Sequence, residues 1–133
     1  MKKLKILIGI ILLLAVSCVD EVVEKEIQLS DPADYNMKIF PENPTGNDEI
    51  KLVIFNDCTY HVLSGVTRNG NTIDIRKQFN SMMKWPCVIK NDTVLIGKLP
   101  AGKYVVNYKL EDIAPQTITS VVLSFSFGLT VKN

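Results

Sequence analysis

Three cysteines and a single histidine are the side chains whose chemistry depends most on spacing in this chain. Cys58 directly follows Asp57 and comes shortly before His61, so a thiol, a carboxylate and an imidazole lie close together in sequence. Such groups support nucleophilic catalysis only when the base reaches the thiol and a third group orients the base. Neighbours along a strand or turn rarely reach that geometry, so we expect His61 to be a solvent-exposed loop residue.

Other signatures of catalysis are missing. The chain has no Cys-x-x-Cys pair, no phosphate-binding glycine loop, no His-Glu-x-x-His and no serine nucleophile elbow. Carboxylate pairs of the glycosidase kind join residues far apart in sequence, and the sequence alone leaves them open. The sequence therefore predicts a protein that is not an enzyme, with no catalytic residue, no metal site and no cofactor.

Cys18 ends an N-terminal segment with an informative order of residue types. Three lysines come first, an apolar run follows over residues 6–14, and Ala15-Val16-Ser17 directly precede the cysteine. The apolar run is too short for a stable membrane span, and a cysteine stands where ordinary secretion has a small-x-small cleavage site. The segment resembles the lipobox of bacterial lipoproteins, although Ala15 occupies a position where a lipobox most often has leucine.

This resemblance implies that residues 1–17 are a signal peptide and that Cys18 becomes the first residue of the mature chain. Cys18 would carry a diacylglyceryl thioether and an acylated amine, with fatty acids such as palmitate, and these chains would anchor the protein in the membrane. Two alternatives are an uncleaved membrane anchor and a secretory peptide cut elsewhere, with Cys18 incidental.

Cleavage changes the charge of the protein. The full chain has 15 basic and 14 acidic residues, and loss of three lysines leaves 12 basic against 14 acidic, a net charge of −2. Lys and Arg are scattered, with no basic run and no clustered aromatic residues, so we set nucleic acid aside as a partner. The mature chain has room for one soluble domain with a single core.

Residues 18–36 have the composition of an acidic tether. Acidic side chains repel one another and Pro32 discourages a helix, so this segment should be extended, with a reach of about 25 Å. Asp20 and Glu21 resemble the acidic export signal that sends some Gram-negative lipoproteins to the outer face of the outer membrane. The resemblance implies an outer-membrane, surface-exposed lipoprotein; a solvated linker without address information is the alternative.

Lipidation of Cys18 would leave Cys58 and Cys87 as the only cysteine pair in an oxidising envelope compartment, so we predict a disulfide between them. Closing a loop of about 30 residues should stabilise the fold by about 3 to 4 kcal/mol. Cys58 follows the second expected strand and Cys87 precedes the fifth, so the disulfide should hold a loop edge and not cross the core. A redox or metal pair has little support.

Residues 37–133 show a period of two broken by turns, which is typical of an antiparallel β-sandwich. Asn69-Gly70 is the strongest hairpin signal. We predict an all-β domain of about seven strands and no clear helix. The clearest alternations lie at residues 50–54, 73–75, 94–96, 104–110 and 121–131.

The segment Leu99-Pro100-Ala101-Gly102-Lys103-Tyr104 sharpens this prediction. It resembles the corner between the fifth and sixth strands of immunoglobulin-like and fibronectin type III domains, where a tyrosine hydroxyl bonds back to the preceding connection. The resemblance implies an immunoglobulin-like sandwich in which Gly102 permits the turn and Tyr104 is the corner tyrosine. Both residues would be structural.

The connection over residues 79–87 is a candidate binding loop. Met82, Met83, Lys84 and Trp85 combine adaptable apolar side chains with a large aromatic surface, and loops on a rigid sandwich commonly carry recognition. The alternative is a lid over one open end of the sandwich, with Met82 and Trp85 buried.

A second candidate loop is Asn43-Pro44-Thr45-Gly46. It resembles the Asn-Pro-Thr loop of chagasin-like cysteine-protease inhibitors, which are also immunoglobulin-like, but the other two loops of that family have no counterpart here. A plain proline turn before a strand explains the same residues.

Asp92-Thr93-Val94 resembles the O-glycosylation site of some Gram-negative envelope proteins, which implies Thr93 as the acceptor. An ordinary turn followed by a β-branched strand residue is the alternative.

These observations favour a lipid-anchored module of the bacterial cell envelope or surface whose loops contact a protein or a glycan. A chagasin-like protease inhibitor and a structural accessory subunit are the alternatives. An inhibitor requires that the Asn43–Gly46 loop share one end of the sandwich with two other exposed loops. An accessory subunit requires an unpaired edge strand that can add to a partner's sheet.

Overall fold

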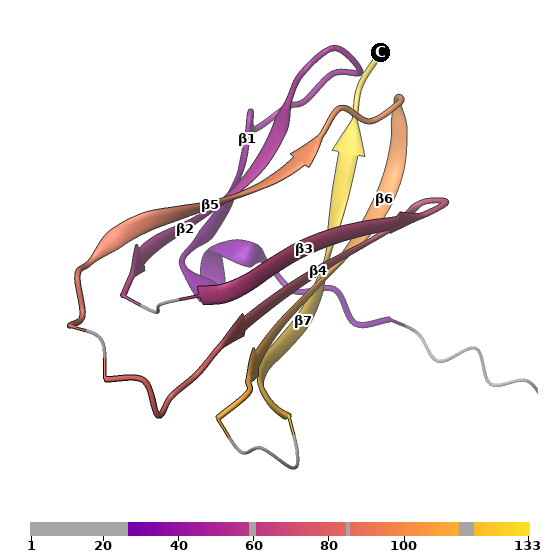
Figure 1. Ribbon diagram of the computed structural model, residues 1–133. Coiled ribbons are helices and arrows are strands. Elements are labelled where there is room, and N and C mark those ends of the chain that lie inside the picture. Colours follow the sequence, from indigo (N-terminus) through magenta and orange to yellow (C-terminus); the bar gives the residue numbers. More distant parts are fainter. Residues whose placement is uncertain (1–26, 59–60, 85, 115–118) are drawn as a thin grey trace, which may run out of the picture.

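The structure, a computed structural model, describes residues 27–58, 61–84, 86–114 and 119–133. In these ranges the chain forms two facing β-sheets and one short 3-10 helix (Figure 1). One sheet has the order β1-β2-β5 and the other the order β3-β4-β6-β7. The elements are η1 (Pro32–Tyr35), β1 (Met37–Phe40), β2 (Ile50–Asp57), β3 (His61–Asn69), β4 (Thr72–Phe79), β5 (Lys90–Gly97), β6 (Gly102–Asp112) and β7 (Ser120–Val131).

The predicted all-β sandwich of about seven strands is confirmed, but one pairing differs from an antiparallel arrangement. β4 and β6 run parallel, while the other named strand pairs are antiparallel. In an immunoglobulin constant domain the third and sixth strands share a sheet without the fourth. Here β4 lies between them because it buries Ile73 and Ile75, whereas residues 64–69 of β3 are half-buried or exposed. The less apolar strand therefore occupies the sheet edge.

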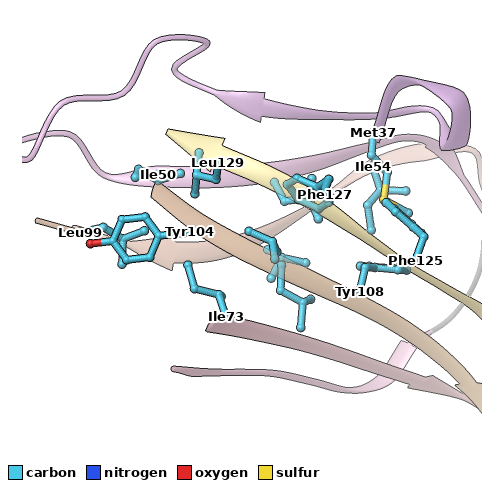
Figure 2. Close-up of a cluster of buried hydrophobic side chains, with 14 of the residues drawn as sticks. Met37, Ile50, Ile54, Ile73, Leu99, Tyr104, Tyr108, Phe125, Phe127 and Leu129 are labelled. Carbon is cyan, nitrogen blue, oxygen red and sulfur yellow. The ribbon is translucent and has the colours of Figure 1, made fainter. Parts of the chain in front are cut away.

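The core lies between the two sheets and follows the period-two pattern (Figure 2). Ile50, Leu52 and Ile54 on β2 point inward together, and Phe125, Phe127 and Leu129 do so on β7. Alternate residues of a strand face opposite sides of its sheet, so the apolar alternation read from the sequence selects the inward face of each strand.

Tyr104 forms the predicted tyrosine corner. Its hydroxyl donates a hydrogen bond of 2.7 Å to the carbonyl oxygen of Pro100, and its side chain is buried. The guanidinium of Arg68 lies 5.4 Å from the centre of the ring. Gly102 does not have the predicted permissive role, because its φ is not positive and a Cβ there would make only ordinary contacts with the Tyr104 ring.

We expect Tyr104→Phe to lower the free energy of unfolding by about 1 to 2 kcal/mol, because the Pro100 carbonyl would lose its partner at a part-buried corner. Urea unfolding followed by intrinsic fluorescence measures this change. Tyr35→Phe is the matched control, since Tyr35 stacks on Phe125 through its ring. An equal loss in both variants would contradict a specific role for the Tyr104 hydroxyl.

The last part of the predicted tether belongs to the folded domain. The backbone nitrogen of Ser30 donates a 2.7 Å hydrogen bond to Ser126, and Tyr35 in η1 stacks on Phe125 with 4.0 Å between ring centres. Pro32 begins η1 because the first turn of a helix needs no proline N–H, and Asp31 caps it by accepting from Ala33. The boundary at residue 36 is therefore corrected: within the described residues, backbone pairing with the sandwich extends as far toward the N-terminus as Leu29.

Candidate functional site

The β4–β5 loop (residues 80–89) carries the most prominent exposed apolar side chains of the described chain. Met82 is 76% exposed, Met83 42%, Val88 65% and Ile89 69%. Lys84 is exposed beside them, and Trp85 lies outside the described residues. The lid interpretation is wrong for Met82, whose side chain extends into solvent. Contiguous exposed apolar side chains on a monomer mark interaction sites more often than an isolated one does.

Both ends of this loop are fixed to the sandwich. Asn80 begins it with a turn, accepting a 3.0 Å hydrogen bond from the nitrogen of Met82 through its side chain. The nitrogen of Ser81 donates to Asp112 at the end of β6 (3.0 Å), and hydrogen bonds from Ser81 and Ala114 hold the pKa of Asp112 below its ordinary value. The loop is therefore anchored while its apolar side chains stay exposed.

The predicted disulfide between Cys58 and Cys87 is present, with 4.8 Å between the two Cα atoms. Cys58 directly follows β2 and Cys87 lies in the β4–β5 loop before β5, and both residues are exposed. The disulfide therefore holds a loop edge and stays out of the core, as expected. It also occupies the Cys58 thiol, so the group next to Asp57 and His61 cannot act as a nucleophile in this form.

His61 begins β3, where it pairs with Phe79, so the prediction of a loop histidine is wrong. The side chain of His61 lies outside the described part of the structure. No group of three or more His, Cys, Asp or Glu residues in the described ranges is arranged to hold a metal ion.

A buried lysine, which the sequence analysis did not identify, lies near the β4–β5 loop. Lys77 shares the inward face of β4 with Ile73 and Ile75, and its side chain is 1% exposed. Its ammonium contacts the carboxylate of Asp92 on β5. No hydrogen bond of ordinary geometry reaches the amine within the described residues, so the nearby carboxylates of Asp92 and Asp57 are what offset its burial. The signal in the sequence was the continuation of the apolar alternation from Ile73 to Lys77.

Burial lowers the pKa of Lys77 to about 8, because desolvation disfavours the ammonium form. The charge of Asp57 raises this pKa and the charge of Lys90 lowers it, but both effects are smaller than desolvation. Burial also raises the pKa of Tyr108 far above its ordinary value, and Asp57 adds to that shift. Lys77 and Tyr108 are buried, Asp92 contacts Lys77, and the charge of Asp57 acts on both Lys77 and Tyr108. These four groups are called the buried cluster, and its two carboxylates are partly exposed.

A β-bulge in β2 brings Asp57 to this cluster. Ile54 pairs with Asp92 and Asp57 pairs with Lys90. Between these two pairs β2 advances by three residues and β5 by two. The extra residue is accommodated at Asn56, whose φ is +54°. Without the bulge, strand alternation from buried Ile54 would direct Asn56 inward and Asp57 outward. The bulge therefore places the carboxylate of Asp57, and not the amide of Asn56, on the inward face.

The candidate inhibitor loop is held firmly at the opposite end of the sandwich (Figure 1). Pro44 is fully buried, and its carbonyl accepts a 2.8 Å hydrogen bond from Lys132. Thr45 donates to Asp48 through both its nitrogen and its hydroxyl (2.7 Å each), which lowers the pKa of Asp48. Gly46 approaches the β5–β6 turn. Only Asn43 of the loop is exposed.

Thr93 is exposed on β5 and pairs with Val53. Its neighbour Asp92 is turned inward toward Lys77 and is only partly exposed. The structure therefore leaves the predicted acceptor hydroxyl accessible, while the preceding aspartate belongs to the buried cluster.

A cleft of about 770 Å³ runs between η1, β1 and the outer edge of β7. In the described chain, the nitrogen of Ser30 donates to the Ser126 carbonyl in the middle of β7, and just beyond β7 Lys132 donates to Pro44 and accepts from Gly46. The stretch between these contacts, Phe127 to Thr130, lines the cleft. Because β7 is an edge strand, this stretch is a candidate to accept an added strand.

Cys18 lies outside the described residues, so its predicted lipidation stays a prediction. The described part of the chain contains no helix long and apolar enough to cross a membrane. No protein-family model, curated protein or solved structure matches this chain.

Proposed function

We propose that this protein is a non-enzymatic module of a bacterial envelope, anchored by lipid at Cys18, that binds a protein partner through the β4–β5 loop. The observation that carries the binding role is the group of exposed apolar side chains on an anchored loop: Met82, Met83, Val88 and Ile89. The proposed lipid anchor is supported by the order of the N-terminal residues: lysines, an apolar run and then a cysteine.

A protein is the partner that fits these side chains best. Methionine adapts its shape to different surfaces, and aliphatic side chains gain binding energy by leaving water against another apolar surface. The disulfide at Cys87 and the hydrogen bond from Ser81 to Asp112 restrict the loop before binding, which reduces the entropy lost on association.

We expect Met82→Ser with Met83→Ser to weaken partner binding by at least tenfold while leaving the unfolding midpoint nearly unchanged, because both side chains are already exposed to water. Proteins cross-linked to the chain in native membranes identify the partner, and binding of that purified partner is then titrated. Leu95→Thr is the matched control, since Leu95 is 52% exposed but lies on β5. Unchanged affinity in the loop variant would contradict the proposed surface.

A structural accessory subunit is a second candidate, favoured by the cleft along residues 127–130 of the β7 edge. Backbone groups there could pair with a strand from another subunit. Hydrogen exchange in the cross-linked complex separates the two candidates, because strand addition protects the amides of residues 127–130 and loop binding protects residues 80–89.

The inhibitor alternative has less support. The Asn43–Gly46 loop does share its end of the sandwich with the β5–β6 turn and the β3–β4 hairpin, whose Asn71 carbonyl accepts from Val105 at the start of β6. However, an inhibitor loop must present its residues to a protease cleft, and Pro44 is fully buried.

A further inference from the structure

The buried cluster beneath the β4–β5 loop contains the reactants of an amide bond. The Lys77 amine from β4 and the Asp92 carboxyl from β5 are in contact, and the Lys77 side chain is shielded almost completely from water. An exposed lysine and carboxylate in contact remain an ion pair because water solvates both charges. Burial makes the ammonium form of Lys77 costly, so its neutral amine becomes accessible, and this amine is in contact with the partly exposed carboxyl of Asp92.

From this juxtaposition we propose that Lys77 and Asp92 condense to an intramolecular isopeptide bond that covalently joins β4 to β5. The proposal concerns the covalent structure of the domain and does not rest on the proposed binding function. The low pKa of Lys77, about 8, supports it because the uncharged amine is the nucleophilic form.

The reaction needs no oxidant, reductant or cofactor. The lone pair of neutral Lys77 Nζ attacks Cγ of protonated Asp92 and forms the N–C bond. Nζ then gives up a proton, the Cγ–OH bond breaks, and the hydroxyl leaves as water after taking up that proton. One amine and one carboxylic acid become one amide and one water molecule.

Asp57 is the group assigned to carry the proton. Its charge acts on Lys77, and the β2 bulge at Asn56 directs it to the inward face of the sheet. A second carboxyl whose charge reaches Lys77 can accept the proton that Nζ gives up and return it to the leaving hydroxyl. A bulge with a non-glycine residue at positive φ is a costly feature that commonly occurs where a side chain must be re-aimed.

Proximity and burial both favour the amide. Groups held in contact react as if present at about 10⁵ to 10⁸ M, which offsets the dilution that drives amide hydrolysis in water. Condensation also replaces the charges of buried Lys77 and partly exposed Asp92 by a neutral amide, which removes the desolvation cost of the buried ammonium. The bond would close the base of the β4–β5 loop from inside, opposite the exposed Cys58–Cys87 disulfide.

Tryptic mapping of the reduced wild-type domain tests the bond directly. Trypsin does not cleave after an acylated lysine, so the bond predicts a branched peptide in which residues 77–84 are joined to residues 91–98. Its mass should be one water molecule below the sum of the two peptides, and the intact reduced domain should show the same deficit. Lys38 and Glu42 provide an internal control, because they are also in contact but are exposed and should stay unlinked.

Variants separate the roles of the three residues. Lys77→Arg and Asp92→Ala should both have the full sequence mass, and Asp57→Asn should slow or abolish the loss of water while Asp57→Glu restores it. Linear peptides 78–84 and 91–98 as the only products from the wild-type domain would overturn the proposal and leave a buried ion pair. Complete linkage in Asp57→Asn at the wild-type rate would overturn the role assigned to Asp57. Tryptic mapping of the wild-type domain tests for the isopeptide bond even if a variant does not fold.

Discussion

Replacing Cys58 and Cys87 by serine is expected to lower the free energy of unfolding by about 3.5 kcal/mol. The two cysteines are 29 residues apart, and the chain-entropy model assigns about this value to a closed loop of that length. For a domain of about 100 residues this corresponds to a fall in melting temperature of roughly 15 to 25 °C. Calorimetry of the double variant measures it, and mild reduction of the wild type should give a similar fall because both cysteines are exposed.

The disulfide variant should also separate stability from binding. Cys87 lies in the β4–β5 loop, so its loss should increase the freedom of the loop as well as the freedom of the unfolded chain. In this variant we expect amide hydrogen exchange to be faster at residues 80–89 than at the core strands. A change of less than about 1 kcal/mol would show that the chain-entropy estimate does not apply, as strain or residual structure in the unfolded chain can cause.

Replacing Cys18 by alanine is expected to abolish membrane attachment. Stable anchoring requires more than one acyl chain, and lipidation of Cys18 would supply them all, so no partial attachment should remain. The measurement is labelling with a fatty acid followed by partition between detergent and water after expression in a Gram-negative host. Wild-type protein should be labelled and enter the detergent phase, and the variant should do neither.

Ser17→Ala is the matched control for this experiment, because it keeps a small residue before the cysteine and should be labelled as the wild type is. Equal partition of Cys18→Ala and wild type into detergent would contradict a lipid anchor. An uncleaved N-terminal anchor would then explain attachment, and the N-terminus of the purified protein would begin at or near Met1.

Local features of the fold could be read from the sequence because they depend on residues close together. Alternation of apolar side chains identified the inward faces of β2 and β7, and the Pro100-to-Tyr104 segment identified the corner whose hydroxyl bond the structure contains. The disulfide followed from the count of cysteines once Cys18 was assigned to lipid. Each of these inferences uses the period of a strand, a turn or a spacing along the chain.

Features of the candidate binding loop could be predicted only in part from such local patterns. The sequence identified Met82 and Met83 as candidates. It left open whether they are buried in a lid or exposed on a binding surface, because apolar loop residues occur in both. The structure decides for exposure at Met82, because the anchors at Asn80, Ser81 and Cys87 hold the loop on the rim of the sandwich. Val88 and Ile89 were missed because the predicted loop ended at Cys87.

The sequence by itself determined the all-β class, the approximate number of strands and the pair of cysteines that is joined. Only the tertiary structure decided that β4 pairs with β6 in parallel, that residues 29–36 pack on β7, and that Lys77, Asp57 and Asp92 meet. The physical reason is that a strand's own period fixes which side chains face inward, whereas its partners are fixed by competition for apolar burial among all strands. Lys77 appears in the local pattern only as a polar residue that continues the alternation of Ile73 and Ile75, and the one-residue bulge leaves almost no trace. Together they bring Lys77, Asp57 and Asp92 into one cluster.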